Sequence, residues 1–259
     1  GHGMETVAGS GRGPNQGNSN VVRVTSLANS GTGSLRWAVE QQGPKTIVFE
    51  LSGYIELEEQ LVIRTPYVTI AGQTAPSPGI TVRGATVIVA ASDVLIQHIR
   101  IRPGDDLNGS DPRNHDSLGI YNSTSLISRV VVDHCSLSWS TDEVLQIWSN
   151  TSDITIRRCL VSEGRYVFGG PLPTLIDVVG NYYIPGADSV LRRFGFSSTV
   201  EIRSTQTTTW LDARMRWRWS SSKVLRCCLP PLRSGPRGWS LRRPCRCSSS
   251  SCRQWGRGP

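Results

Sequence analysis

The densest group of reactive side chains lies between Asp116 and Glu143. Aligning residues 115–121 with residues 142–148 places Asp116 over Glu143, with Asp142 immediately before it. Carboxylates on neighbouring turns of a repeat repel each other unless a cation neutralises them. Hard carboxylate oxygens favour calcium over zinc. The pattern therefore indicates a calcium site, and solvated residues at strand ends are the alternative.

A second polar run, Asp133-His134-Cys135-Ser136, directly follows three valines and is expected at the end of a strand. His134 is either a general base or a side chain hydrogen-bonded into a polar ladder between turns, and the residues favour the ladder. The order of residues supports neither a Ser-His-Asp triad nor a Cys-His pair.

Short β-branched runs recur along the chain and must position these side chains. Their first residues stand at 68, 94, 130, 154, 176 and 200, at intervals of 26, 36, 24, 22 and 24 residues. The long interval contains a polar loop at 103–114. Two or three short strands in a period near 24, without a Leu-rich consensus or long helices, predict a right-handed parallel β-helix in an all-β chain.

A second set of short strands is expected between these runs, at residues 61–63, 80–82, 118–120 and 144–147. Cys135 and Cys159 occupy the same position in successive repeats, where Ile99 precedes them and Asn181 follows. Two stacked buried thiols are favoured, and a disulfide is the alternative.

One short helix is expected near the N-terminus. Ser34 is a good capping residue for a helix over residues 35–42, and Gly43-Pro44 ends it. Leu35, Ala38 and Val39 would share its buried face.

The net charge of +8 is unevenly distributed. Of the 28 Lys and Arg residues, 12 follow Asp212, the last acidic residue, so the first 212 residues carry 16 basic and 20 acidic side chains. The segment 207–259 is rich in Arg, Ser, Cys, Pro and Trp, lacks the repeat, and is predicted to be irregular. An out-of-frame reading of a GC-rich gene is favoured over a basic polyanion-binding tail. Its cysteines lack zinc-knuckle spacing.

The ordered motifs of the chain resemble those of the pectate lyases of polysaccharide lyase family 1. The resemblance covers roughly residues 1–204 and rests on short segments that are weak singly and specific together. They are Val22–Leu27, Gly33–Arg36, Ile70–Pro76, Ile101–Asp105, Val132–Trp139 and Thr141–Val144. The family fold is a right-handed parallel β-helix, in agreement with the repeat.

The resemblance implies calcium-dependent β-elimination of polygalacturonate, in which an arginine removes the C5 proton next to a cation-bound carboxylate. Asp116 and Asp142 match family calcium ligands, and Glu143 is a neighbouring ligand. Gln146 falls where many members have another aspartate, which predicts weaker calcium binding. The family's Asp-His signature gives Asp133 and His134 a mainly structural role near the site.

The sequence departs from the family pattern between Glu163 and Thr174. The family's Arg-x-Pro-Arg segment is missing, and about one coil is expected to be deleted near residues 165–172. Arg165 is the arginine nearest the expected place of the base, and an ordinary solvated arginine is the alternative. The domain boundaries expected are therefore a β-helix over 1–206 and an aberrant tail over 207–259.

The expected protein is a secreted monomer that acts on pectin and has neither a nucleic-acid nor a membrane partner. The first residues lack the pattern of a secretory signal, and three Asn-x-Ser/Thr sequons, at Asn108, Asn122 and Asn150, favour export. A β-helix that binds acidic polysaccharide without cleaving it is the main alternative. An inverting polygalacturonase is a third possibility, although its Asn-x-Asp and Arg-Ile-Lys segments are missing.

Overall fold

The computed structural model describes residues 3–13, 17–105, 112–148, 150–169, 176–187 and 189, together with strand segments at 201–203, 209–210 and 224–226. All of them fall within one compact unit, residues 1–229. No helix among them is long and apolar enough to cross a membrane.

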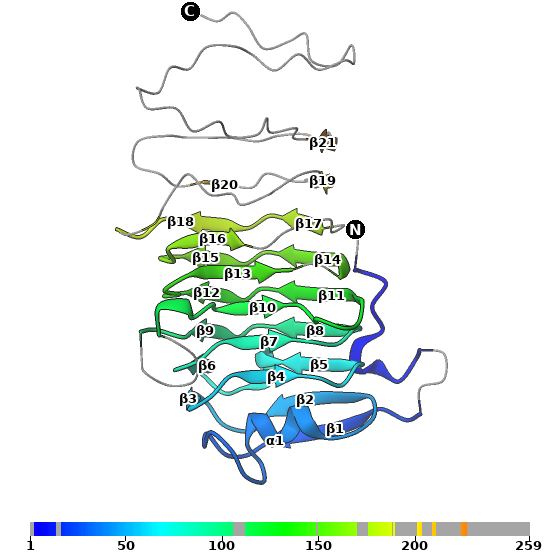
Figure 1. Ribbon diagram of the computed structural model, residues 1–259. Coiled ribbons are helices and arrows are strands. Elements are labelled where there is room, and N and C mark those ends of the chain that lie inside the picture. Colours follow the sequence, from blue (N-terminus) through cyan, green and yellow to red (C-terminus); the bar gives the residue numbers. More distant parts are fainter. Residues whose placement is uncertain are drawn as a thin grey trace, which may run out of the picture. The chain divides into compact units, whose positions relative to one another are not determined.

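Three sheets account for almost all regular structure in the described residues (Figure 1). Sheet A contains β1 (Asn20–Val24), β2 (Lys45–Phe49), β5 (Val68–Ala71), β8 (Val94–Gln97), β11 (Ile127–Asp133), β14 (Thr151–Arg157), β17 (Ile176–Val179), β19 (Glu201–Arg203) and β21 (Val224–Arg226). Sheet B contains β3 (Gly53–Glu56), β6 (Ile80–Arg83), β9 (Arg100–Arg102), β12 (Ser136–Ser138), β15 (Leu160–Ser162), β18 (Tyr182–Ile184) and β20 (Thr209–Trp210). Sheet C contains β4 (Leu61–Ile63), β7 (Val87–Val89), β10 (Leu118–Ile120), β13 (Glu143–Ile147) and β16 (Tyr166–Gly169).

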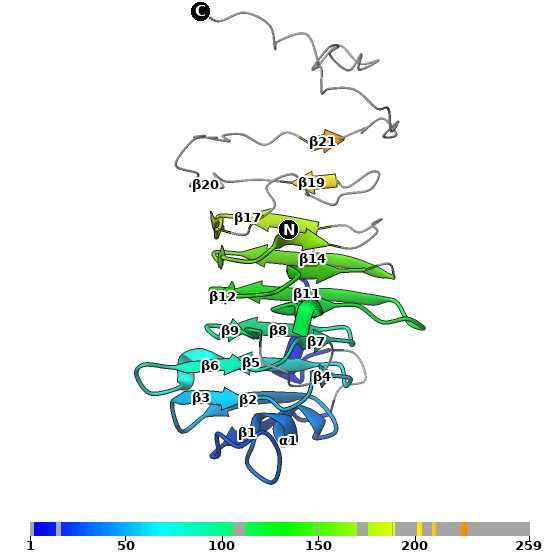
Figure 2. The same cartoon turned by 60° about the vertical axis from the view of Figure 1, so that its left-hand side comes forward.

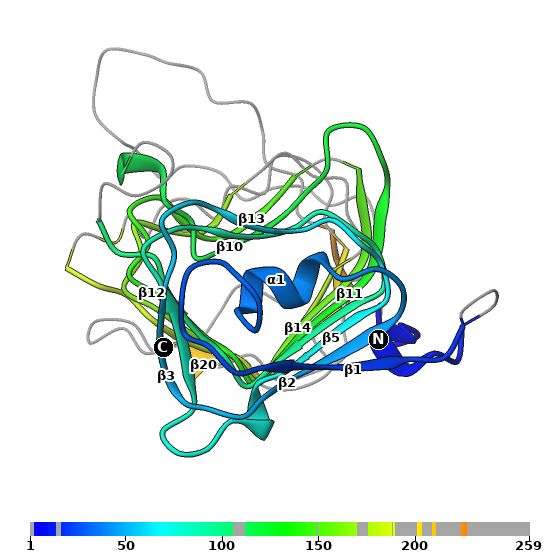
Figure 3. The ribbon, with the colours of Figure 1, turned by 90° about the horizontal axis from the view of Figure 1, so that it is seen from below.

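From β2 to β16, each coil visits sheet A, sheet B and sheet C in turn, and neighbouring coils pair in parallel. Seen from the end that carries the helix α1 (Leu35–Glu40), the chain runs clockwise as it moves away from the reader (Figure 3). A clockwise path that recedes from the viewer is a right-handed coil. The predicted right-handed parallel β-helix is therefore confirmed.

The short N-terminal helix is also confirmed, and it lies across the first coils (Figure 3). The Ser34 side chain accepts a hydrogen bond from the Trp37 amide, and Leu35, Ala38 and Val39 are buried. The helix ends at Glu40, two residues earlier than the sequence predicts. In the described part of the chain, 3-10 turns also lie at Ala8–Ser10, Gly72–Thr74 and Pro112–Asn114.

The predicted repeat is confirmed for five coils and wrong at the sixth. Residues 68, 94, 130, 154 and 176 are in register across sheet A. The strands β5, β8, β11, β14 and β17 that carry them follow one another along the stack in Figure 2. Ile176, however, pairs with Ile202, two residues beyond the predicted position 200. The second predicted set mixes two sheets, because the strand at 80–82 belongs to sheet B and the other three to sheet C.

The interior is filled by side chains stacked from coil to coil. Cys135 and Cys159 are both free and buried, so the predicted stack of thiols is confirmed. The Cys159 amide donates to the side-chain oxygen of Asn181, which holds the same place one coil later. Equivalent residues of successive coils therefore stack on one another in the interior.

Three corners join the sheets, and each repeats a left-handed residue from coil to coil. The A-to-B corner has His98, His134 and Arg158, the C-to-A corner has Asp93, Arg129 and Asp153, and the B-to-C corner has Gly104, Trp139 and Glu163. The B-to-C corner also carries the longest insertion, between β9 and β10.

The predicted tail, residues 207–259, falls mostly outside the described residues. Within it the structure places β20, parallel to β18, and β21, which pairs with β19 in the antiparallel sense. The expected deletion near 165–172 falls partly on residues 170–175, which are also outside the described part. The irregular tail and the deleted coil therefore both remain predictions.

Candidate functional site

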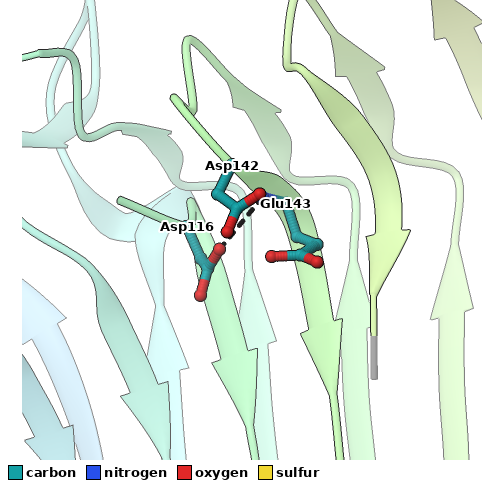
Figure 4. Close-up of side chains that lie close together, drawn as sticks. All are labelled: Asp116, Asp142 and Glu143. Carbon is teal, nitrogen blue, oxygen red and sulfur yellow. Dashed lines mark hydrogen bonds between the residues drawn. The ribbon is translucent and has the colours of Figure 1, made fainter. Parts of the chain in front are cut away.

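The carboxylates of Asp116, Asp142 and Glu143 meet at the B-to-C corner, where β10 and β13 begin (Figure 4). One oxygen from each lies within 4.8 Å of the others. The strand register aligns Leu118 with Leu145, which sets Asp116 beside Glu143. The juxtaposition expected from the alignment is therefore present.

Backbone hydrogen bonds hold this corner in place. The Glu143 amide donates to Oδ1 of Asp116 at 3.0 Å, and the Asp116 amide donates to the Thr86 hydroxyl at 3.1 Å. The carbonyl of His115 accepts from the amides of Thr141 and Asp142, at 3.0 and 3.3 Å. Three successive coils are thus tied together around the carboxylates, which fixes the separation of Asp116 and Glu143.

Crowding of negative charge perturbs the two aligned carboxyls. Burial, and then the charge of Glu143, raise the pKa of Asp116 to about 8. Burial, and then the charge of Asp142, raise the pKa of Glu143. Asp116 is 3% exposed, so water screens little of this repulsion. A divalent cation would relieve it.

We expect the metal-free protein to lose stability as the pH rises from about 4 to 8. The raised pKa of Asp116 means that the folded state holds a proton that the unfolded state releases near pH 4. This contribution to stability is complete below pH 4 and is lost as the pH rises towards 8. Urea denaturation in chelator at pH 5 and pH 8 measures the loss, and Asp116→Asn removes the part due to this group.

Glu40→Gln, at an exposed helix position, is the matched control and should leave the pH dependence of wild type unchanged. Equal losses of unfolding free energy in Asp116→Asn and wild type would show that the Asp116 carboxyl is not the strained group.

Gln146 lies farther along β13 than the three carboxylates. It is three residues beyond Glu143, which is roughly 10 Å along an extended strand. It is half-buried and stands beside Gly119 of β10. The structure therefore does not place Gln146 in the carboxylate cluster.

Arg165 follows one coil later at the same corner. The amide of Tyr166 donates to the carbonyl of Asp142 at 3.0 Å, and Tyr166 pairs with Glu143. Arg165 therefore stands beside Asp142. It is exposed, and its guanidinium lies 5.5 Å from the centre of the Tyr166 ring. Among the described residues, it forms no ion pair with the three carboxylates.

Asp133 and His134 lie at a different corner, at the end of β11 between sheets A and B. Nδ1 of His134 is 2.8 Å from Asp133, and its ring stacks on His98 with centroids 4.8 Å apart. Burial alone would raise the pKa of Asp133, but hydrogen bonds from Arg157 and Gln97 lower it. His134 thus contacts its neighbour Asp133 and stacks on His98 of the preceding coil, and its structural role stays a prediction.

Tyr121 was not identified from the sequence, although it borders the cluster. An ideal Cβ on Gly119 would lie 2.6 Å from Cε1 of Tyr121, so the ring lies against the bare backbone of β10. Burial, and then the charge of Asp116, raise the pKa of Tyr121. The aligned segments 115–121 and 142–148 already set Tyr121 beside Trp148, but not the direction of the ring.

The chain is similar in sequence to curated pectate lyases, and no family model matches it. Probable pectate lyase C of Aspergillus flavus is 39% identical over 145 residues, which are 56% of this chain and 32% of that protein. The Aspergillus fumigatus protein of the same name is 39% identical over 148 residues, or 57% of this chain and 33% of that protein. Pectate lyase 1 of Ambrosia artemisiifolia is 27% identical over 152 residues, or 54% of this chain and 37% of that protein. The chain spans about a third of the length of these relatives.

Among solved structures, the fold is similar to that of Jun a 1, the major allergen from cedar pollen. The TM-score is 0.50 at 18% sequence identity, over 81% of this chain and 68% of that chain. At this identity the likeness concerns the fold alone, and it agrees with the β-helix. The resemblance stated from the sequence motifs is confirmed by the curated relatives.

Proposed function

We propose that this chain, a sequence relative of the pectate lyases, cleaves polygalacturonate by calcium-dependent β-elimination. The observation that carries the proposal is the meeting of Asp116, Asp142 and Glu143 from two successive coils. Asp116 is buried and the other two are half-buried, and their mutually repelling charges favour occupation by a divalent cation.

The donor set fits calcium. Carboxylate oxygens are the ligands that calcium prefers, at about 2.3–2.6 Å, so ligand oxygens around one ion lie up to roughly 5 Å apart. The separation within the cluster, 4.8 Å, falls in this range. Three side chains leave several of the six to eight positions for water and for a uronate carboxylate.

Bound calcium would stabilise negative charge on the uronate carboxylate and so acidify the neighbouring C5 proton. Two hydrogen bonds orient Asp116 for this role. The Glu143 amide donates to its carboxylate, and its own amide donates to the Thr86 hydroxyl. We assign removal of the C5 proton to Arg165, which stands one coil beyond Asp142 and reaches solvent.

A second candidate function is binding of acidic polysaccharide without cleavage. It is favoured by one observation, the contact of the Arg165 guanidinium with the Tyr166 ring at 5.5 Å. A guanidinium held over its neighbour's ring is positioned to bind anions.

The test is the ultraviolet absorbance of unsaturated uronides formed from polygalacturonate by the refolded soluble chain. We expect product with calcium and none with chelator. Retention on a pectate column without product would favour the binding function, and release of reducing ends without absorbance would favour hydrolysis. Product formation in chelator would contradict the role of calcium.

The remaining properties are proposed on the same basis. We propose a secreted monomer whose partner is pectin rather than nucleic acid or a membrane, with glycosylation at its sequons. Asn150 is exposed, the amide nitrogen of Asn122 donates to the Ala90 carbonyl, and Asn108 lies outside the described residues. We also propose that residues 207–259 are an aberrant tail rather than a part of the catalytic domain.

A further inference from the structure

Along the strands of sheet C, the residues on the outer face change from acidic to uncharged to aromatic. Asp142 and Glu143 stand at its beginning, and Gly119 and Gln146 lie side by side in the middle, without charge. Tyr121 and Trp148 follow at its end, in matching positions of successive coils, and the Trp148 amide donates to the carbonyl of Ile120. The carboxylate cluster, two uncharged residues and two aromatic rings thus adjoin one another on one face of the sheet.

Tyr121 extends from the aromatic end back towards the cluster. Its ring covers Gly119, and the negative charge of Asp116 acts on its phenol. Within the described part of the chain, no group hydrogen-bonds the phenol hydroxyl. Trp148 beside it is 44% exposed. An aromatic face with a free hydroxyl next to a charged site is suited to the apolar face and the hydroxyls of a sugar ring.

Few cations face this region. Among the described residues of β7, β10 and β13, no outward position carries Lys or Arg. Arg64 follows β4 and holds the position equivalent to Tyr121 two coils earlier, so the two backbones lie roughly 10 Å apart. Arg165 stands at the opposite end of the strands, beside Asp142. A second free carboxylate bound over Tyr121 would lack a counter-charge.

We propose that Tyr121 and Trp148 form a subsite for an uncharged, methyl-esterified uronate ring, next to the free uronate held at the carboxylate cluster. This inference rests on the proposed function and refines its substrate to partially esterified pectin. Tyr121 is a positioning residue that contacts the neighbouring sugar, and Gly119 is required because any Cβ would displace its ring.

The test is isothermal titration calorimetry with calcium in the Arg165→Ala background, which limits turnover. The two probes are a fully de-esterified oligogalacturonide and a half methyl-esterified one of the same length. We expect the half-esterified probe to bind several-fold more tightly. Tyr121→Ala should weaken its binding by ~10-fold and Tyr121→Phe by ~3-fold, from lost stacking and lost hydrogen bonding.

Tyr54→Ala is the control, because Tyr54 is an exposed tyrosine on sheet B, and it should change neither affinity. Gly119→Ala keeps the phenol and displaces the ring, so it should reproduce the loss if Tyr121→Ala folds poorly. Equal affinities for the two probes, or no change in folded Tyr121→Phe and Gly119→Ala, would overturn the subsite while calcium binding still supports the proposed function. Absence of calcium binding would overturn both.

Discussion

Asp116→Asn will abolish the stabilisation of the protein by calcium. For wild type, calcium at 100 to 1,000 times its dissociation constant should raise the free energy of unfolding by about 3–4 kcal/mol. Asp116 is the most buried of the three carboxylates, and its pKa of about 8 shows how strongly its charge is opposed when no cation is present. The asparagine removes that charge, which weakens both the repulsion within the cluster and its electrostatic attraction for a cation.

The measurement is urea denaturation at pH 8 with calcium and with chelator. In chelator, Asp116→Asn should be at least as stable as wild type, because it lacks the opposed charge; calcium should then add less than about 0.5 kcal/mol. Glu40→Gln should respond to calcium as wild type does. A calcium response of Asp116→Asn equal to that of wild type would place the cation elsewhere.

Arg165→Ala is the second change with a large expected effect. If Arg165 takes the C5 proton, its loss should lower kcat for elimination by about 10²–10⁴-fold, the usual contribution of a positioned proton acceptor. The increase in stability caused by calcium should be unchanged, because Arg165 forms no ion pair with the cluster among the described residues. Initial rates of absorbance on polygalacturonate measure the effect.

Arg158→Ala provides the matched control, because Arg158 is an exposed arginine of the same coil at the A-to-B corner. It should retain the wild-type kcat. If Arg165→Ala stays within about threefold of wild type, the proton acceptor is another group and the stacking of Arg165 on Tyr166 is structural.

Much of the scaffold could be predicted because stacked coils repeat the same environment. Buried triplets such as 130–132 and 154–156 recur at intervals near the length of one coil, which identified sheet A. The same repeat predicted Cys135 beside Cys159 and Asp116 beside Glu143, since residues in parallel register occupy equivalent places.

The errors have equally physical causes. Inward and outward residues of an extended strand alternate with a period of two, so the hydrophobic pattern alone does not distinguish position 200 from position 202. The triplet at 80–82 looks like those of sheet C because the strands of both sheets are short, buried apolar runs. Tyr121 was missed because its direction depends on the empty space above Gly119.

The most direct test of the account is a crystal structure of the protein grown with calcium. We expect one cation at about 2.3–2.6 Å from carboxylate oxygens of Asp116, Asp142 and Glu143, with the remaining positions held by water or uronate. At saturating calcium, a cation bound elsewhere, or three carboxylates that stay together without one, would contradict the account.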